Sequence, residues 1–365
     1  MIIAAVTASM MLVSSGCTMQ RKDGKKVIGI SMPSKSIERW DRDGEYLKQK
    51  FEEEGYIVEL RYSDNNADMQ VNDLQVLIAD DVDLLIVVAN DGNTLFRTLE
   101  DAKIKNIPVL AYDRLIMNTD AVSYYISFDN YQVGVLQAQY IVDELKLDTT
   151  EEKHNIELVS GDPADNNATY FYNGALDTLR PYLDTGELTI VSGKEEFLES
   201  STPGWSTDKA FENMQNTLAS YYSDGTVLEA VLCATDKLSV GVTQAIQSDY
   251  KGELPIITGQ DGDVAVLKNI VDGLQSMTIY KNVSDEADVT VDVAKAILDG
   301  KTIDKSLIAS FSVPCTFDTE SYHNGIQLIP SYLLKPEIIT AENIGSLVDT
   351  GLYRWDDEHK YLIAD

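Results

Sequence analysis

The feature that most constrains the fold of this chain is a repeated alternation between short apolar runs and longer amphipathic segments. The short runs are rich in β-branched residues, which favour strands, and they lie at 27–32, 56–62, 84–89 and 107–112. Segments with apolar residues at spacings of three and four, typical of helices, lie between them at 39–54, 69–79 and 94–105. Strict alternation of strand and helix favours a parallel sheet that helices cover on both faces.

The same alternation starts again in the second half of the chain. Further strands are expected at 123–127, 156–159, 188–191, 230–233, 256–258 and 277–280. Because 365 residues, 44% of them hydrophobic, exceed one ordinary domain, we expect two doubly wound, Rossmann-like lobes rather than one large sheet. The remaining elements expected are a helix at 285–298, extended segments at 307–313 and 326–334, a helix at 341–348, and a polar tail at 353–365 that folds onto one lobe or frays.

The charge balance excludes several classes of function. The chain carries 29 Lys and Arg against 60 Asp and Glu, a net charge of −31 that repels phosphate backbones and anionic membrane surfaces. Nucleic-acid binding is therefore excluded as the main activity. The three histidines, His154, His323 and His359, lack the spacing of metal ligands, and the three cysteines are too scattered for a zinc ribbon. We expect neither a metal nor a cofactor.

The first residues resemble a bacterial lipoprotein signal. A short apolar run, 1–13, is too brief to span a membrane and leads through Ser15 and Gly16 into Cys17. In such signals the cysteine sulfur receives a lipid that holds the mature protein at a membrane surface. We therefore predict that 1–26 is a lipoprotein signal peptide and tether, with Cys17 as the lipidated residue; the alternative is a disordered N-terminus with a chance cysteine.

Polar and aromatic side chains follow nearly every predicted strand. In doubly wound sheets, ligands bind outside the carboxyl ends of the strands, so these residues are candidates for a ligand site. The candidates are Lys35, Arg39, Trp40, Asn90, Asp91, Asp113, Arg114, Asp162, Asp165, Asn166, Asn167, Phe171, Asp236, Lys237, Gln260, Asp261 and Lys281. Any one of them has an ordinary alternative role, because Asp and Asn after a strand often cap a helix and lysines are often solvated.

The composition of these strand ends indicates an uncharged polyol. Neither G-x-x-x-x-G-K-[ST] nor G-x-G-x-x-G, the glycine-rich patterns of nucleotide sites, is present. A sugar hydroxyl both donates and accepts, so it fits between a carboxylate and a guanidinium group such as those of Asp113 and Arg114. The apolar face of a sugar ring packs on an aromatic side chain, for which Trp40, Phe171 and Trp205 are available.

Seven segments of the chain, in order, resemble the substrate-binding proteins of sugar ABC importers in the periplasmic binding protein type I group. They are 38–40 with 43–44, 110–114, 126–130 with 133–134, 165–168, 259–261, 278–281 and 330–336. The similar branches are the xylose-binding and multiple-sugar-binding proteins. Thr235 stands where the xylose branch has Asn, which favours the multiple-sugar branch.

The resemblance implies two α/β lobes joined by a hinge of three strands, with a monosaccharide of the xylose, galactose, glucose or arabinose type between them. It places the N-terminal lobe at 27–113 plus 282–326 and the C-terminal lobe at 114–281 plus 327–365. The pocket residues that it implies are Arg39, Asp113, Arg114, Asp165, Asn166, Asn167, Phe171, Trp205, Asp236, Asp261 and Lys281.

The implied function is that of a monomeric, non-enzymatic lipoprotein outside the cytoplasm, either lipid-anchored to the cell membrane or periplasmic. It would deliver the sugar to the membrane permease and ATPase subunits of an ABC importer. The alternative is a sensor that presents bound sugar to a chemoreceptor or histidine kinase. A repressor would need an N-terminal helix-turn-helix, for which residues 1–26 leave no room. A glycosidase using Asp113 and Asp261 is the remaining enzymatic alternative.

Overall fold

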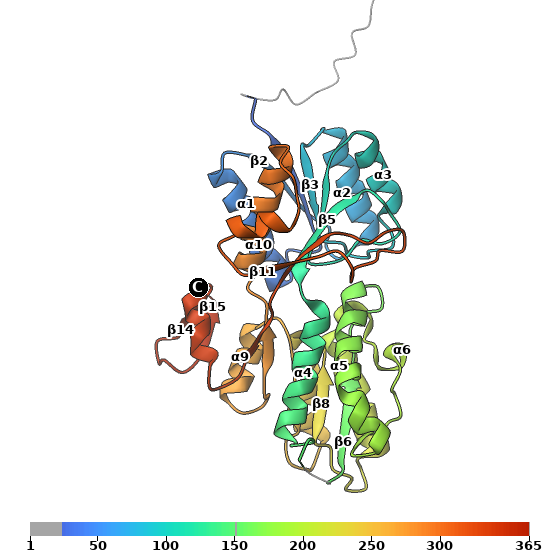
Figure 1. Cartoon of the computed structure of the whole chain (residues 1–365). Helices are drawn as coiled ribbons and strands as arrows, with labels where there is room; N and C mark the ends of the chain where they lie inside the picture. Colours follow the sequence, from blue (N-terminus) through green and yellow to red (C-terminus); the bar gives the residue numbers. More distant parts are fainter. Residues whose placement is uncertain (1–23, 150–151, 365) are drawn as a thin grey trace, which may run out of the picture.

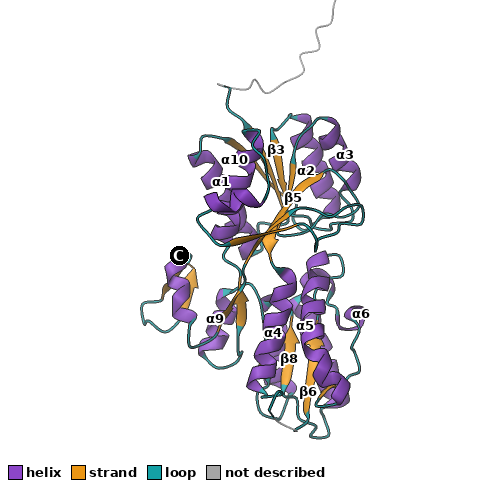
Figure 2. Ribbon diagram, viewed as in Figure 1, coloured by secondary structure: helices purple, strands orange, loops and turns teal. Residues whose placement is uncertain are grey.

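The computed structural model of the protein describes residues 24–149 and 152–364; the predicted lipidation site, Cys17, lies outside the described residues. Two α/β lobes stand one above the other, each with a sheet between layers of helices (Figures 1 and 2). No helix within the described ranges is both long and apolar enough to cross a membrane.

The first lobe is built on a sheet with the order β11-β12-β5-β4-β3-β1-β2, in which only β11 runs antiparallel to its neighbour. Its strands are β1 (Val27–Met32), β2 (Ile57–Tyr62), β3 (Leu84–Val87), β4 (Val109–Tyr112), β5 (Val122–Phe128), β11 (Cys315–Asp318) and β12 (Ser331–Leu334). Its helices are α1 (Glu38–Glu53), α2 (Ala67–Ala79), α3 (Phe96–Ile104) and α10 (Val283–Leu298).

The central strand β3 shows why this sheet needs helices on both faces. All four of its residues are buried, and successive side chains of a strand point to opposite faces. Leu84 and Ile86 belong to the core under α1 and α10, whereas Leu85 and Val87 belong to the core under α2 and α3. A continuous apolar run therefore predicts a doubly covered strand, as found.

The second lobe repeats this design with the parallel sheet β7-β6-β8-β9. Its strands are β6 (His154–Val159), β7 (Leu188–Ile190), β8 (Ala230–Cys233) and β9 (Ile256–Ile257). Helices α4 (Asn130–Glu144) and α5 (Asn166–Thr185) cover one face, and α7 (Thr207–Tyr221) and α8 (Asp236–Asp249) cover the other. Three shorter helices complete this part of the lobe: α6 (Phe197–Ser200), the 3-10 helix η1 (Pro203–Trp205) and α9 (Val264–Val271).

The chain crosses between the lobes three times: from β5 to α4, from β10 (Thr278–Tyr280) to α10, and from β12 to β13 (Glu337–Ile339). The three crossovers meet where the two lobes join (Figure 1). Two predicted boundaries are corrected. Strand β5 was assigned to the second lobe, but it pairs with β4 and β12, so the first crossover follows Phe128 and not Asp113. Strand β12 likewise lies in the first lobe. Periodicity identifies a strand but does not say which strand it pairs with.

The end of the chain also differs from its prediction. The segment 307–313 was expected to be extended, but the 3-10 helix η2 spans Lys305–Ser310. The last helix is a 3-10 helix, η3 (Ile344–Thr350), and the polar tail forms a hairpin of β14 (Tyr353–Trp355) and β15 (Leu362–Ala364). This hairpin packs on α9 of the second lobe through a shared apolar core that includes Tyr353 and Leu362.

Candidate functional site

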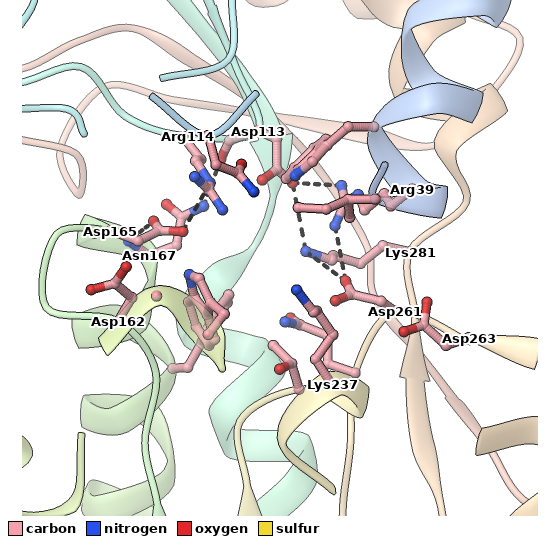
Figure 3. A pocket seen from close by; sticks show the side chains of 18 of the residues that line it. Arg39, Asp113, Arg114, Asp162, Asp165, Asn167, Lys237, Asp261, Asp263 and Lys281 are labelled. Atoms are coloured by element: carbon pink, nitrogen blue, oxygen red, sulfur yellow. Dashed lines mark hydrogen bonds and ion pairs between the residues drawn. The ribbon is translucent and has the colours of Figure 1, made fainter. Parts of the chain in front are cut away.

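A cavity of about 180 Å³ lies between the lobes, next to the crossovers. This volume is below the roughly 300–1,000 Å³ of sites for drug-sized molecules, so it suits one small ring. Ten of the residues predicted from the sequence line it: Arg39, Trp40, Asp113, Arg114, Asp165, Asn167, Phe171, Trp205, Asp261 and Lys281. Side chains from both lobes converge on it (Figure 3).

Arg39, in the first turn of α1, lies at the centre of a group of carboxylates. Its Nη2 donates to Asp113 Oδ2 at 2.6 Å and its Nη1 donates to Asp261 Oδ1 at 2.9 Å (Figure 3). Its Nη2 also donates to Glu286 Oε2 at 3.2 Å. Its Nε donates to Asp43 Oδ2 at 3.3 Å. Because Asp261 comes from the second lobe and the other carboxylates come from the first lobe or its edge, Arg39 connects the two lobes.

Lys281, at the second crossover, completes what we call the Arg39 cluster: Arg39, Lys281, Asp43, Asp113, Asp261 and Glu286. Its Nζ lies 3.5 Å from Asp113 Oδ2 and 3.3 Å from Asp261 Oδ1, and its side chain is 3% exposed. Two cations therefore face four carboxylates in a largely buried place. Burying unbalanced charge is costly unless some groups take up protons.

The pKa values in the cluster follow from this imbalance. Burial raises the pKa of Asp43 to about 6, although Arg39 and a hydrogen bond from Tyr112 oppose the shift. Burial, together with nearby Asp113, raises the pKa of Glu286 well above its usual value. Burial also disfavours the charged form of Asp113, but Arg39, Lys281 and Arg114 outweigh it and lower the pKa of Asp113. Asp113 is thus the carboxylate held ionised.

The backbone at Asp113 is held in an uncommon conformation. Its φ of 56° lies in the left-handed region, which residues other than glycine seldom occupy. Its carbonyl oxygen accepts from Tyr125 Oη at 2.5 Å, from Ser127 Oγ at 3.0 Å and from Asn167 Nδ2 at 2.7 Å. Such strain persists only where the surroundings enforce it, as at binding sites. Asn167 therefore helps to position Asp113 as well as lining the cavity.

Arg114 directly follows Asp113 and reaches toward Asp165 rather than toward Arg39 (Figure 3). Its Nε lies 2.9 Å from Asp165 Oδ2, and its Nη1 donates to the carbonyl of Ala89 at 3.0 Å. Asp165 also caps α5 by accepting from the backbone N–H of Asn167, so its two roles coexist. Burial raises the pKa of Asp165, and Arg114 opposes that shift.

Three aromatic side chains line the cavity. The guanidinium carbons of Arg39 and Arg114 lie 4.8 Å and 5.2 Å from the Trp40 ring centre, so Trp40 packs against both cations. Lys281 lies 5.8 Å from the Phe171 ring centre. Trp205 packs so closely on the backbone at Gly161 that a Cβ added there would lie 2.0 Å from the ring. Gly161 is thus required by Trp205.

Besides Arg114 Nε, which pairs with Asp165, four buried polar atoms of residues on the cavity wall make no hydrogen bond to any residue within the described ranges: Asn90 Oδ1, Thr235 Oγ1, Gln260 Oε1 and Trp205 Nε1. Buried polar atoms are satisfied in almost all proteins, so orphaned atoms on a cavity wall point to a ligand that bonds to them. The two amide oxygens accept, the indole N–H donates and the threonine hydroxyl can do both, which matches the hydroxyl groups of a sugar.

Three predicted site residues lie elsewhere. Lys35 is exposed and pairs with Glu45 at 3.2 Å, because it follows β1 on the outer side of α1. Asn166 is next to the cavity in sequence but does not line it. Asp236 is fully buried beneath the turn 259–263, where it accepts from Thr278 Oγ1 and from the backbone N–H of Asp263, each at 2.8 Å. A position after a strand does not fix where the side chain points.

Four further strand-end candidates line the cavity, although the resemblance did not imply a pocket role for them: Asn90, Asp162, Lys237 and Gln260. Of these, Gln260 lies in a segment that resembles the family. Asp43 and Glu286 lie behind Arg39, on helices. An acidic residue in a helical pattern predicts a position that faces solvent, so the sequence did not indicate them. The available signal for Asp43 was its position four residues after Arg39, on the same helix face.

The cavity wall is suited to binding a neutral polar ligand. Within 24–149 and 152–364, no group of three or more His, Cys, Asp or Glu could hold a metal ion. The fixed cations, carboxylates and aromatic rings can hold a neutral polyol through paired hydrogen bonds and ring packing.

Two α/β lobes with a polar cavity at their junction define a protein of the two-lobed, ligand-clamping class. The model of the periplasmic binding protein domain matches residues 28–302, and the chain therefore belongs to the periplasmic binding protein family, as the sequence predicted. The multiple sugar-binding periplasmic protein SbpA of Azospirillum brasilense is 37% identical over 356 residues, which cover 96% of each chain. The multiple sugar-binding periplasmic receptor ChvE of Rhizobium radiobacter is 39% identical, covering 91% of this chain and 92% of that protein.

A solved structure supports the same assignment. An ABC transporter solute-binding protein from Clostridium phytofermentans, with bound β-D-glucose, is 43% identical and superimposes with a TM-score of 0.85. The match covers 92% of this chain and 99% of that one. A carbohydrate transporter solute-binding protein from Chloroflexus aurantiacus, in complex with D-glucose, is 26% identical with a TM-score of 0.79, over 91% and 97% of the two chains.

Proposed function

We propose that this protein is the extracytoplasmic sugar-binding component of an ABC importer, and that it captures a monosaccharide in the cavity between its lobes. The observation that carries the proposal is the cavity wall itself. Carboxylates, guanidinium groups and aromatic rings from both lobes surround a space of about 180 Å³, and four buried polar atoms on its wall lack a partner among the described residues.

The chemistry of the wall favours a neutral sugar. Arg39 and Asp113 offer charged donors and acceptors on one side, while Arg114 and Asp165 offer them on the other. Each hydroxyl that lies between such groups can donate and accept at once, and bonds to charged groups are the stronger ones. A sugar ring packed on Trp205 would lose water from its apolar face.

The relatives narrow the choice of sugar. Two similar proteins are described as multiple sugar-binding, and the solved structure of 43% identity holds β-D-glucose. D-Glucose is therefore the first sugar to test, followed by galactose, arabinose and xylose. The multiple-sugar branch, and not the xylose branch, is our proposal for the specificity class.

Delivery to a permease follows from the same family membership, because both solved structures are described as transporter solute-binding proteins. We propose that the partners are the membrane permease and ATPase subunits of an ABC importer, and that the binding protein acts as a monomer. Of the two functions that the sequence left open, transport is thus better supported than sensing. No step of catalysis is needed.

Anchoring through Cys17 is a separate part of the proposal and rests on the sequence 14–17 alone. Full-length protein produced in bacteria should then partition with membranes and gain the mass of a lipid, while Cys17→Ser should not. A mature wild-type protein that retains residues 1–16 and gains no lipid mass would contradict anchoring without touching sugar binding.

The experiment that tests sugar binding is a thermal-shift screen of aldoses, followed by calorimetric titration. A sugar at a hundred times its dissociation constant should stabilise the folded protein by about 2.7 kcal/mol. If no aldose raises the melting temperature, the proposed function is wrong.

A further inference from the structure

A second contact between the lobes lies outside the cavity, at the end of the chain. Tyr353, the first residue of β14, is 1% exposed and packs in the core that the C-terminal hairpin shares with α9 of the second lobe. Its hydroxyl accepts from Nη1 of Arg42 on α1 at 3.2 Å, and the Arg42 guanidinium carbon lies 5.5 Å from its ring centre. In Figure 1 the hairpin lies beside α9, on the side of the molecule that carries α1.

The same hydroxyl also reaches the turn that carries Asp261. It donates to the carbonyl oxygen of Gly262 at 2.9 Å, which leaves its lone pair for Arg42. The turn is strained at Asp261, where φ is 107°, whereas glycine adopts the φ of 75° at Gly262 without strain. A backbone of this kind persists only where its surroundings hold it. Tyr353 and Asp236, which accepts from the N–H of Asp263, hold this turn from two sides.

Two of the contacts that cross between the lobes involve one stretch of α1. Arg39 binds Asp261 inside the cavity, and Arg42, one helical turn further on, binds Tyr353 outside it. Next to the Arg42–Tyr353 contact, a groove of about 620 Å³ lies between α1 and the end of the chain. Its lining includes Arg42, Gly351 and Leu352. The Arg42–Tyr353 contact therefore bridges two surfaces that are otherwise separated by a groove.

We propose that Tyr353 is a positioning residue for the sugar site, which holds the turn that carries Asp261 and ties it to α1 when the lobes are together. This inference rests on the proposed function. The Arg42–Tyr353 contact joins different lobes, so it stabilises the arrangement in which Arg39 and Asp261 face one ligand. A contact made only in the binding-competent arrangement raises apparent affinity by raising the population of that arrangement.

The test compares two tyrosines of the same C-terminal segment. Tyr353→Phe keeps the ring and removes the hydroxyl that bonds to Gly262 and Arg42. Tyr361→Phe is the matched control, because the Tyr361 hydroxyl bonds to Asp272 at 2.9 Å, within the second lobe. With D-glucose as the probe in calorimetry, we expect Tyr353→Phe to raise the dissociation constant by about three- to tenfold, the range that one or two hydrogen bonds provide. Tyr361→Phe should leave the constant unchanged.

A purely structural role for Tyr353 would lower the melting temperature of the sugar-free protein without changing the dissociation constant of folded protein. Arg42→Gln separates the two roles, since it removes the contact between lobes and leaves the bond to Gly262. We expect Arg42→Gln to weaken glucose binding and to increase the radius of gyration of the sugar-free protein in small-angle scattering. The effects of Arg42→Gln and Tyr353→Phe should not add, because both remove the same contact.

Equal dissociation constants for Tyr353→Phe, Arg42→Gln and Tyr361→Phe, in a wild-type background that binds glucose, would overturn this inference and leave the proposed function standing. A wild-type protein that binds no aldose would remove the proposed function, and this inference with it.

Discussion

The two arginines of the cavity differ in how much of the fold depends on them. Arg39 has a side chain that is 6% exposed and bonds to four carboxylates, two of which, Asp43 and Glu286, are wholly buried behind it. Arg114 is 14% exposed, pairs with Asp165 and bonds to backbone carbonyls. Arg39 neutralises part of the protein interior, whereas Arg114 lies against the space for the ligand.

Residues on the same cavity wall can therefore contribute unequally to folding stability and to ligand affinity. Removing one partner of a buried ionic group leaves the others uncompensated, which is costly in folding free energy. Removing a partly exposed group that lies against the cavity lets water replace some of its contacts. The two arginines should therefore respond differently to the same substitution.

The largest effect is expected for Arg39→Ala. With the guanidinium gone, Asp43, Asp113 and Glu286 lose the cation that bonds to all three, and among them Lys281 pairs only with Asp113. The free energy of unfolding should fall by about 3–5 kcal/mol, as in other broken buried pairs. Urea unfolding measures it. A loss below about 1 kcal/mol would show that the buried carboxylates do not depend on Arg39.

Arg114→Ala is the opposite case. Hydrogen bonds to charged groups contribute about 1.5–3 kcal/mol each. The dissociation constant for glucose should therefore increase by a factor of roughly ten to several hundred. The melting temperature of the sugar-free protein should fall much less than in Arg39→Ala. Calorimetry beside a melting curve distinguishes the two, and native-like affinity in Arg114→Ala would place the ligand elsewhere.

A smaller effect is expected for the pH dependence of the free energy of unfolding, through the Asp43 carboxyl beside Arg39. Burial raises the pKa of Asp43 to about 6, above the value of about 3.9 for an unperturbed Asp. A raised pKa means that the folded state favours the protonated carboxyl. The resulting stabilisation is complete below about pH 4 and is lost as the pH rises through about 6.

The variant Asp43→Asn isolates this effect, because the two proteins differ only at the Asp43 carboxyl and share every other titratable group. The free energy of unfolding of the wild type, minus that of the variant, should decrease between pH 4 and pH 7 and then level off. Urea unfolding at several pH values measures the difference. A difference that is constant with pH would contradict a raised pKa for Asp43.

The residues around the two arginines differ in how well the sequence predicts them. Asp113, Arg114, Asp261 and Lys281 were found because polar residues directly after the strands of doubly wound folds are candidates for a ligand site, although Lys281 follows β10, which pairs antiparallel with β13. Asp43 and Glu286 could not be found in this way. They lie on helices, and only the packing of α10 against α1 brings Glu286 to Arg39.

The misplaced residues have the same cause. Asp236 and Lys35 both follow strands, yet one supports a turn from below and the other faces solvent with Glu45. The lobe boundary at Asp113 failed because β5 resembles the start of a new unit, while its pairing with β12, some 200 residues later, decides where it belongs. Strand identity is local in sequence, whereas strand pairing is not.

The fluorescence of a single tryptophan can show whether the sugar binds between the lobes. The chain has three, and Trp205 lines the cavity while Trp355 lies in the C-terminal hairpin beside His359. The measurement is the emission of a Trp205-only protein, Trp40→Phe with Trp355→Phe, during titration with D-glucose, with binding verified by calorimetry. We predict a saturable change in emission at the calorimetric dissociation constant. Calorimetric binding with unchanged Trp205 emission would contradict a sugar site between the lobes.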